Sequence, residues 1–524
     1  MSRNKGTPAL SLYIIGIFYG LAINQPYLFK CLTGEMAGAG GDKAMDYSQR
    51  INKWIEENQT AIIGFLQDLI RIPSVTGEEG PIQRFIAKQL NEMGLTVDAF
   101  EPSLDSLRKH PAFVEVSQGY EGRPNVVGLL KGVGGGKSLL FNGHVDVIPA
   151  GAQESWQHGC WSGDFADGRI YGRGASDMKS GIAAMTMAIK AIMESGIRLR
   201  GDVILEYTVD EELSGNGTLA CVMKGYKADG GICCETSSMK VQPGSIGRIW
   251  FEIKVKGMAA GIQRRWEGIN AIGKGYLVTQ AVSDFERLRV ERLSHPLYPD
   301  IRGAIPCMVG VFESGSYHSA FPDSCLLKGS MATIPGEDSA AVKAEFVKFI
   351  HEKAAADPWM KEHPPEVIFT GYFAEPSEIP ADSPIVQTLS RNFVKVMGEE
   401  PVISGREGAA DIRFMNSYGN TPTVIFGPGM TEQMHANNEY VNVDKLIEST
   451  KILALTIVEW CRIEQRQQSP TSLGGGFLIE KAVSGEIQSP TDVVQSPCEG
   501  GARRCNVREL MPDSFRHKRL TKFE

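Results

Sequence analysis

The chain has 524 residues, of which 42% are hydrophobic and 22% are charged. This composition can bury a large core, which excludes a disordered or fibrous polymer. At ~100 to 200 residues per domain, the length predicts two to four domains. The formal net charge of -8 does not attract a polyanion, which argues against nucleic acid as the partner. The ten cysteines form no CxxC pair, so the sequence indicates neither a zinc finger nor a disulfide framework.

The first 44 residues contain one apolar run, residues 9–23, preceded by Arg3 and Lys5. About 15 apolar residues are too few for a membrane span and suit the core of a signal peptide, although no clear A-x-A cleavage pattern follows. Residues 45–70 then read as one complete amphipathic helix. Residues 1–44 are therefore interpreted as an N-terminal extension, with a signal or anchor as the alternative. We expect a cytoplasmic protein unless residues 9–23 export it or tether it to a membrane.

Residues 45–242 alternate between strand-like and helix-like patterns. Strands are predicted over residues 125–131, 138–141, 203–208 and 230–234, and helices over residues 182–197 and 214–223. Short apolar strands separated by helices indicate an α/β fold whose sheet is buried on both faces. The stretch KGVGGGKS at residues 131–138 lacks the first glycine of a phosphate-binding loop and precedes a strand. We interpret it as a flexible hairpin turn.

The pattern changes over residues 243–373 and then changes back. Strands are predicted there over residues 250–255, 308–312 and 324–331, and helices over residues 269–288 and 339–353. This order predicts a small α+β domain with an open sheet and helices on one face. Residues 374–464 resume the α/β pattern, with a strand at 423–426 and a helix at 443–460, so the α+β domain is inserted into the first. The Ser-, Pro- and Gly-rich residues 465–524 are predicted to form a mostly disordered tail.

Residues that can bind a metal follow several of the predicted strands. Each also has an ordinary explanation, such as a structural histidine, a helix cap or a solvated acidic turn. Together, two imidazoles and three carboxylates suit a pair of zinc ions that share one acid. These residues are His144, Asp177, Glu212, Glu235 and His435. Glu211 adjoins one of them and is then available as the base that deprotonates metal-bound water.

The motifs around these residues resemble those of the co-catalytic zinc hydrolases that include acetylornithine deacetylase, succinyl-diaminopimelate desuccinylase, aminoacylase and glutamate carboxypeptidase. The likeness runs from about Met45 to Arg462 and rests on GHVDVIPAG, YGRGASDMKSGIAA, TVDEELSGNGT, GICCET and MHANNEYV. It implies a zinc-peptidase-like mixed sheet flanked by helices, with the inserted domain acting as a dimerisation and lid domain. It also implies a homodimer formed through that domain and a cis peptide bond after Asp177.

The resemblance assigns roles to individual residues of the site. It implies two Zn²⁺ per chain, with Co²⁺ or Mn²⁺ as substitutes. One ion would be held by His144, Asp177 and Glu235, and the other by Asp177, Glu212 and His435. Asp146 would orient His144, and Glu211 would be the general base and acid.

Recognition of a free substrate carboxylate would involve an arginine fork and a Gly-rich backbone turn. By resemblance these are Arg413 in ADIRF and Gly427 to Gly429 in FGPG. The alternative for Arg413 is a surface ion pair with Asp411.

One position departs from the resemblance. The lid histidine of the family's G-x-x-A-H pattern is Gly261 in this chain, and loss of an oxyanion donor typically slows a reaction ~10²- to 10³-fold. His318, Arg264 and Arg265 are candidate substitutes. The sequence therefore predicts a dizinc hydrolase of amide bonds next to a free carboxylate, acting on an N-acyl amino acid or a short peptide. The alternative is a slow or non-catalytic descendant that binds metal and ligand.

Overall fold

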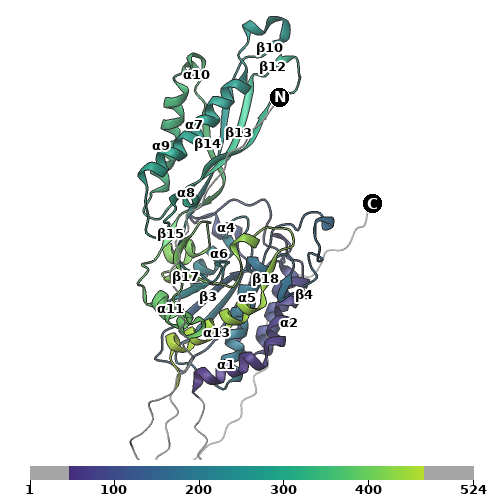
Figure 1. Cartoon of the computed structure of the whole chain (residues 1–524), viewed down its shortest axis with the longest axis vertical. Helices are drawn as coiled ribbons and strands as arrows, with labels where there is room; N and C mark the ends of the chain where they lie inside the picture. The colour runs from purple at the N-terminus through teal and green to yellow at the C-terminus, as the bar shows by residue number, and fades with distance from the viewer. Residues whose placement is uncertain (1–45, 465–524) are drawn as a thin grey trace, which may run out of the picture. The chain divides into compact units, whose positions relative to one another are not determined.

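The computed structural model describes residues 46–464 (Figure 1). The predictions for residues 1–44 and 465–524 therefore lie outside the described residues. Among the residues that are described, no helix is both long enough and apolar enough to cross a bilayer. Where the protein resides stays a prediction.

A nine-stranded mixed sheet forms the centre of the larger part of the described chain. Its strands are β1 (Thr96–Phe100), β2 (Asn125–Leu130), β3 (Leu139–His144), β6 (Val203–Thr208), β7 (Gly231–Cys233), β8 (Val241–Ser245), β15 (Ser377–Glu378), β16 (Ile403–Arg406) and β17 (Thr423–Ile425). They are ordered β1-β2-β6-β3-β7-β17-β8-β15, and β16 pairs with β8. The central strands β6, β3, β7 and β17 run parallel, so their carboxyl ends meet at one edge.

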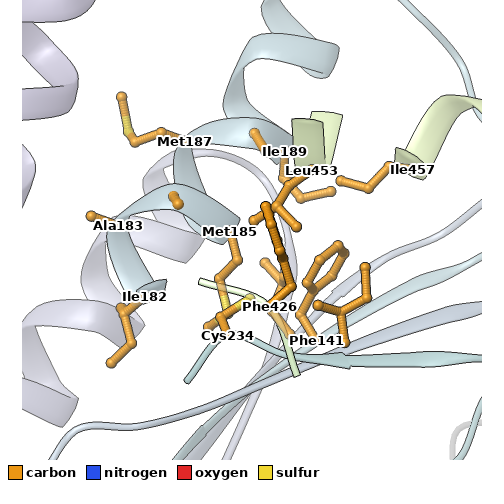
Figure 2. Close-up of a cluster of buried hydrophobic side chains, with 14 of the residues drawn as sticks. Phe141, Ile182, Ala183, Met185, Met187, Ile189, Cys234, Phe426, Leu453 and Ile457 are labelled. Atoms are coloured by element: carbon orange, nitrogen blue, oxygen red, sulfur yellow. The ribbon is translucent and has the colours of Figure 1, made fainter. Parts of the chain in front are cut away.

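Helices cover both faces of this sheet. One face carries α1 (Tyr47–Glu57), α2 (Gln59–Arg71), α3 (Gly80–Glu92), α5 (Ser180–Glu194), α11 (Pro384–Met397) and α13 (Val443–Cys461), and the other carries α6 (Asn216–Lys224) and α12 (Ile412–Ser417). The short helix α4 (Leu104–Leu107) contacts α6. Strand alternation divides β3 between the two cores, with Phe141 on the first face and Leu140 on the second. Figure 2 shows Phe141 and Phe426 beneath Met185 of α5 and Leu453 of α13. The α/β fold with both sheet faces buried is confirmed.

A second sheet of four strands lies within the chain between β8 and β15 and has its own core. Its strands, in the order β11-β13-β9-β14, are β11 (Cys307–Ser314), β13 (Ser324–Thr333), β9 (Gly247–Lys256) and β14 (Glu366–Ala374). Helices α7 (Ala271–Arg292) and α9 (Ser339–Ala354) pack on one face through Phe285 and Phe346. The expected α+β insertion is confirmed as part of the fold class, while the exact domain boundaries stay a prediction.

Shorter elements complete the described chain. Three are strands of a three-stranded sheet, β4 (Asp164–Ala166), β5 (Arg169–Tyr171) and β18 (Tyr440–Asn442), and two form a two-stranded sheet, β10 (Ala260–Gly261) and β12 (Ala320–Phe321). The others are the helices α8 (Ile301–Ala304) and α10 (Pro358–Glu362), the 3₁₀ segments η1 (Gln153–Ser155), η3 (Ile262–Glu267) and η4 (Thr431–Gln433), and the π-type turn η2 (Ala175–Lys179). The seven described cysteines are free and buried, which agrees with the absence of a disulfide framework in this part of the chain.

The prediction of one continuous first helix is wrong, because α1 and α2 are separated at Asn58. Asn58 has φ -113° and ψ 20°, outside the helical region. Its side-chain amide donates to the carbonyl of Trp54 at 2.8 Å, as its backbone N–H also does. Asparagine favours such local bonds over a helix interior, so the chain turns there.

The prediction of a hairpin turn at residues 131–138 is also wrong. Strand β6 lies between β2 and β3 and pairs with both of them, antiparallel to β2 and parallel to β3. The glycine-rich stretch therefore crosses the end of β6 and does not join two paired strands. Its backbone is held by bonds from Val133 to Leu199 and from Gly134 to Arg200.

Candidate metal centre

The residues expected to bind metal gather where the central parallel strands end. His144 is the last residue of β3, Glu212 follows β6, and Glu235 follows β7. Asp177 lies in η2, just before α5, and His435 lies in the loop between β17 and β18. Open α/β sheets place ligands at this carboxyl edge, because the loops after neighbouring strands converge there. The Asp177–Met178 peptide bond is cis, as the resemblance implied.

Two groups of potential ligand atoms share Asp177. In the first, the Nε2 atom of His144 lies 3.3 Å from Asp177 Oδ1 and 3.3 Å from Glu235 Oε2. In the second, the Nε2 atom of His435 lies 3.0 Å from Glu212 Oε2 and 3.5 Å from Asp177 Oδ2. Within each group the donor atoms all lie within 4.8 Å of one another. The two oxygens of Asp177 thus face different groups, which is the arrangement that a bridging carboxylate requires.

The chemistry of these atoms fits divalent cations. Asp177 Oδ1 and Glu235 Oε2 are buried and have no hydrogen-bond partner among the described residues. Burial, together with the charge of Asp177, raises the pKa of Glu212 to about 7. Buried carboxylates this close together repel one another unless a cation neutralises them. Imidazole nitrogens and carboxylate oxygens are the donor set that zinc and related ions accept.

Asp146 connects this group to the turn after β6. Its carboxylate accepts from the backbone N–H groups of Glu211 and Glu212, both at 3.1 Å, and from the hydroxyl of Thr76 at 2.8 Å. The Nδ1 atom of His144 lies 2.9 Å from the backbone oxygen of Asp146 and 3.6 Å from its carboxylate. The contact within hydrogen-bond range of the ring is therefore the carbonyl, while the carboxylate positions the acidic turn.

Glu211 lies beside both ligand groups and belongs to neither of them. Its Oε2 atom is 3.9 Å from His144 Nε2, and its side chain is 16% exposed, so it borders the cleft. Burial raises the pKa of Glu211, an effect that the nearby His144 opposes. A carboxyl group with a raised pKa beside a metal site is suited to act as a general base and acid.

Sequence reasoning missed two residues that hold the ligands in place. Glu439 is buried, accepts from the N–H groups of Ser176 and Asp177 at 2.8 and 2.9 Å, and pairs with Arg173 at 2.7 Å. Arg406, the last residue of β16, donates to the Oε1 atom of Glu235. The signal for Glu439 was its place four residues after His435 in MHANNE. Arg406 could have been found because it is a positively charged residue at the end of a strand, where the other site residues also lie.

The structure does not bring Arg413 to the ligand groups. Its guanidinium is buried, donates to the carbonyl of Ser214 at 2.9 Å and lies 3.5 Å from Asp411. The N–H of Gly427 is bound to the hydroxyl of Ser237, whereas Gly429 packs against the carbonyl of Ser176 so closely that a Cβ would lie 2.2 Å from it. The substrate roles of Arg413, Gly427 and Gly429 stay predictions.

A cleft of about 560 Å³ opens over the ligand groups, a volume typical of small-molecule sites. Its floor includes Asp177, Glu212 and His435, and the strands β9 and β14 of the inserted sheet contribute Arg248 and Tyr372 to its wall. Gly261 is exposed in β10, and among the described residues neither it nor Arg264, Arg265 or His318 lines this cleft.

Comparison with known proteins identifies the family of this chain. The chain belongs to peptidase family M20/M25/M40, whose model matches residues 140–459. It is 31% identical over 440 residues to an N-formyl-4-amino-5-aminomethyl-2-methylpyrimidine deformylase of Bacillus subtilis, covering 80% of this chain and 98% of the relative. It is 40% identical over 154 residues to a succinyl-diaminopimelate desuccinylase of Methylorubrum populi, covering 29% of this chain and 36% of the relative.

Solved structures share the fold. Human carnosine dipeptidase 1 aligns with a TM-score of 0.61 at 16% identity, over 80% of this chain and 99% of that one. A tripeptidase of Staphylococcus aureus aligns with a TM-score of 0.59 at 21% identity, over 76% of this chain and 98% of the tripeptidase. A dinuclear metal-binding peptidase of family M20 from Bacillus subtilis aligns with a TM-score of 0.52 at 14% identity, over 77% and 99%. The expected membership of the metallopeptidase and deacylase family is confirmed, and the protein is a metal-dependent amide hydrolase or peptidase.

Proposed function

We propose that the chain is a dizinc hydrolase that cleaves an amide bond next to a free carboxylate, as an N-acyl amino acid deacylase or an exopeptidase. The observation that carries the proposal is the pair of ligand groups sharing Asp177 at the floor of an open cleft. The first ion would be held by His144 and Glu235 with Asp177, and the second by Glu212 and His435 with the same carboxylate. When bound, zinc polarises an amide carbonyl and lowers the pKa of water.

The protein's own residues would then move the proton. Glu211 borders the cleft and is not needed as a ligand, so its carboxylate takes a proton from the attacking water and delivers it to the leaving amine nitrogen. Asp146 holds this turn through the backbone of Glu211 and Glu212. Arg406 binds one oxygen of Glu235 and leaves the other free to act as a ligand.

A second substrate class is favoured by one comparison. The deformylase of Bacillus subtilis is matched along 98% of its length, and by its name it acts on an N-formyl aminomethylpyrimidine. An N-formyl amine attached to a flat ring is therefore the alternative substrate, and both classes keep the same metal centre and the same Glu211.

The test is metal content and turnover of the purified full chain. We expect about two zinc ions per chain and hydrolysis within a panel of N-acyl amino acids, dipeptides and the N-formyl pyrimidine. Glu211→Gln should retain the metal and lose about 10²- to 10⁴-fold in kcat, because it removes the general base. His144→Ala should lose metal as well as turnover.

Two results would contradict the proposal. A chain with fewer than two ions after zinc loading would refute the shared-carboxylate centre. Full loading without hydrolysis across the panel would instead favour the alternative of a slow or non-catalytic descendant. Gly261 has extended backbone geometry, φ -69° and ψ 159°, and open space around its Cβ position. Gly261→His is therefore sterically acceptable, and a large gain in rate would show that the missing lid donor limits turnover.

We also propose a homodimer formed through the inserted sheet and its helices. The support is a group of exposed aromatic side chains in that part of the chain, Trp266, Tyr276 and Tyr317.

A further inference from the structure

The wall of the cleft on the side of the inserted sheet has its own chemistry. Side chains alternate along β9, so Ile249 and Phe251 enter the core beneath α7 and α9 while Arg248 and Trp250 lie on the other face. Arg248 and Trp250 both line the cleft, together with Tyr372 of β14. The face of the sheet not covered by helices therefore presents one cation and two aromatic rings toward the metal centre.

An irregularity in β14 sets the position of this wall. Phe369 pairs with Phe251 and Phe373 with Ile249, so three residues of β14 lie opposite Trp250 alone. Gly371, in the middle of the three, has φ +78°, and a Cβ there would lie 2.9 Å from the Trp250 ring. The Trp250 and Tyr372 rings are 6.0 Å apart. Bulges of this kind redirect side chains near active sites, and this one brings Gly371 and Tyr372 against the Trp250 ring.

Arg248 differs from the other arginines of the cleft in having no acidic partner. Arg123 pairs with Glu79 at 2.5 Å, and Arg406 pairs with Glu235. No described carboxylate lies within ion-pair distance of Arg248, and no described residue accepts a hydrogen bond from its side chain. Burial lowers the pKa of Arg248, which means that its charge is poorly compensated in the free protein. A bound anion would supply the missing partner.

We propose that Arg248 binds the carboxylate of the substrate, with Trp250 forming the adjoining surface. This inference rests on the proposed function, and it assigns to Arg248 the role that the sequence suggested for Arg413. A guanidinium matches a carboxylate through two parallel hydrogen bonds. Arg413 is enclosed, donates to the carbonyl of Ser214 and lies 3.5 Å from Asp411, whereas Arg248 faces the cleft with no carboxylate within ion-pair distance among the described residues.

The experiment measures binding separately from turnover. The zinc-loaded full chain carrying Glu211→Gln is titrated by calorimetry with N-acetyl-L-phenylalanine and with N-acetyl-L-phenylalaninamide, which differ only in the carboxylate. We expect the acid to bind more tightly. Adding Arg248→Gln should raise the Kd of the acid about 10- to 100-fold and leave that of the amide unchanged, the usual effect of losing a hydrogen bond to a charged group.

Lys254→Gln is the matched control. Lys254 lies on the same strand and the same face as Arg248, six residues further along, but does not line the cleft. Lys254→Gln should leave the Kd of the acid and the Kd of the amide unchanged. Arg248→Lys should recover part of the affinity, because it keeps the charge and loses the fork.

The outcomes separate the inference from the function on which it rests. Equal binding of the two probes, no binding of either, or an unchanged preference in Arg248→Gln overturns the role of Arg248. If the wild-type chain hydrolyses amides but shows no such preference, the proposed hydrolase stands and only this inference falls. If the acid binds through Arg248 but no amide is hydrolysed, the inference stands and the proposed function falls.

Discussion

At the scale of single residues, Glu206 is a buried acid that the proposed chemistry does not use. It points from β6 toward the face covered by α6 and α12, where one carboxyl oxygen accepts from Asn142 at 3.1 Å. The other oxygen has no partner among the described residues. Burial raises the pKa of Glu206 to about 8, and Asp411 adds to this effect. The folded protein therefore holds this proton more tightly than the unfolded chain does.

The sign of the resulting pH dependence follows from linkage. Below the ordinary carboxyl pKa of 4.5, the folded and unfolded chains both carry the proton, so the titration of Glu206 does not lower the free energy of unfolding. Between that value and about 8, the unfolded chain loses the proton first, so the free energy of unfolding falls by about 1.4 kcal/mol per pH unit from this group. Glu206→Gln should flatten the decline between pH 5 and pH 8 in urea unfolding. Replacement of the exposed Glu400 in Glu400→Gln should leave the decline as it is in the wild-type protein. An equal slope in the wild type, Glu206→Gln and Glu400→Gln would refute the assignment of this pH dependence to Glu206.

At the scale of elements, helix α7 is attached to the inserted sheet by a buried cation. Arg289 is fully buried and donates to the carbonyl of Ala332 at 2.7 Å and to Glu337 at 2.6 Å. Three residues later on the same helix, Arg292 pairs with Glu345. Both of these side chains are more than a third exposed, at 41% and 34%. Burial decides how much each ion pair contributes to the free energy of unfolding, because water weakens the attraction within the exposed pair.

Replacement of each arginine by alanine should therefore differ in effect. Arg289→Ala removes the guanidinium from the carbonyl of Ala332 and from the Glu337 carboxylate, which is 12% exposed and keeps the backbone N–H of Ile334, and it should lower the free energy of unfolding by about 3 kcal/mol. Arg292→Ala should cost about 0 to 1 kcal/mol. Denaturant unfolding followed by circular dichroism measures both. Similar losses for the two variants would show that the Arg289 contacts are not worth more than surface ones.

At the scale of the whole molecule, exposed aromatic residues gather at one end of the inserted part. Trp266 of η3, Tyr276 of α7 and Tyr317 before β12 are 72%, 60% and 70% exposed. They belong to one region, because α7 begins where Ala271 donates to the carbonyl of Pro322, just after β12. Exposed apolar groups of this kind commonly mark a protein–protein contact, which supports the proposed homodimer.

The dimer is tested by molar mass in solution. We expect the wild-type chain to elute as a dimer in size exclusion with light scattering. Trp266→Asp combined with Tyr276→Asp should weaken the dimer by about 10²-fold or more and give a monomer, because aromatic residues dominate interface energies. Val133→Asp, at a 43% exposed apolar residue in the loop before β3, should leave the dimer intact. A monomeric wild-type chain would refute the proposal.

The sequence by itself determined the local features of this protein. Alternation of short apolar strands and helices predicted the two-sided sheet, and the motifs that contain His144, Asp177, Glu212, Glu235 and His435 pointed to residues that the fold does bring together. The sequence carries this information because hydrophobic periodicity and motif spacing are encoded within short stretches of chain. The break at Asn58 was missed, since a single side-chain hydrogen bond decided it.

Only the tertiary structure decided which side chains face the cleft. His144 and His435 meet at one edge although 290 residues separate them along the chain, and Arg248 of the inserted sheet lines the same cleft. Arg413 matched a motif but is enclosed, whereas Arg248 matched none and is free to bind. Exposure and the lack of a partner depend on contacts between distant segments, and no local pattern of residues records them.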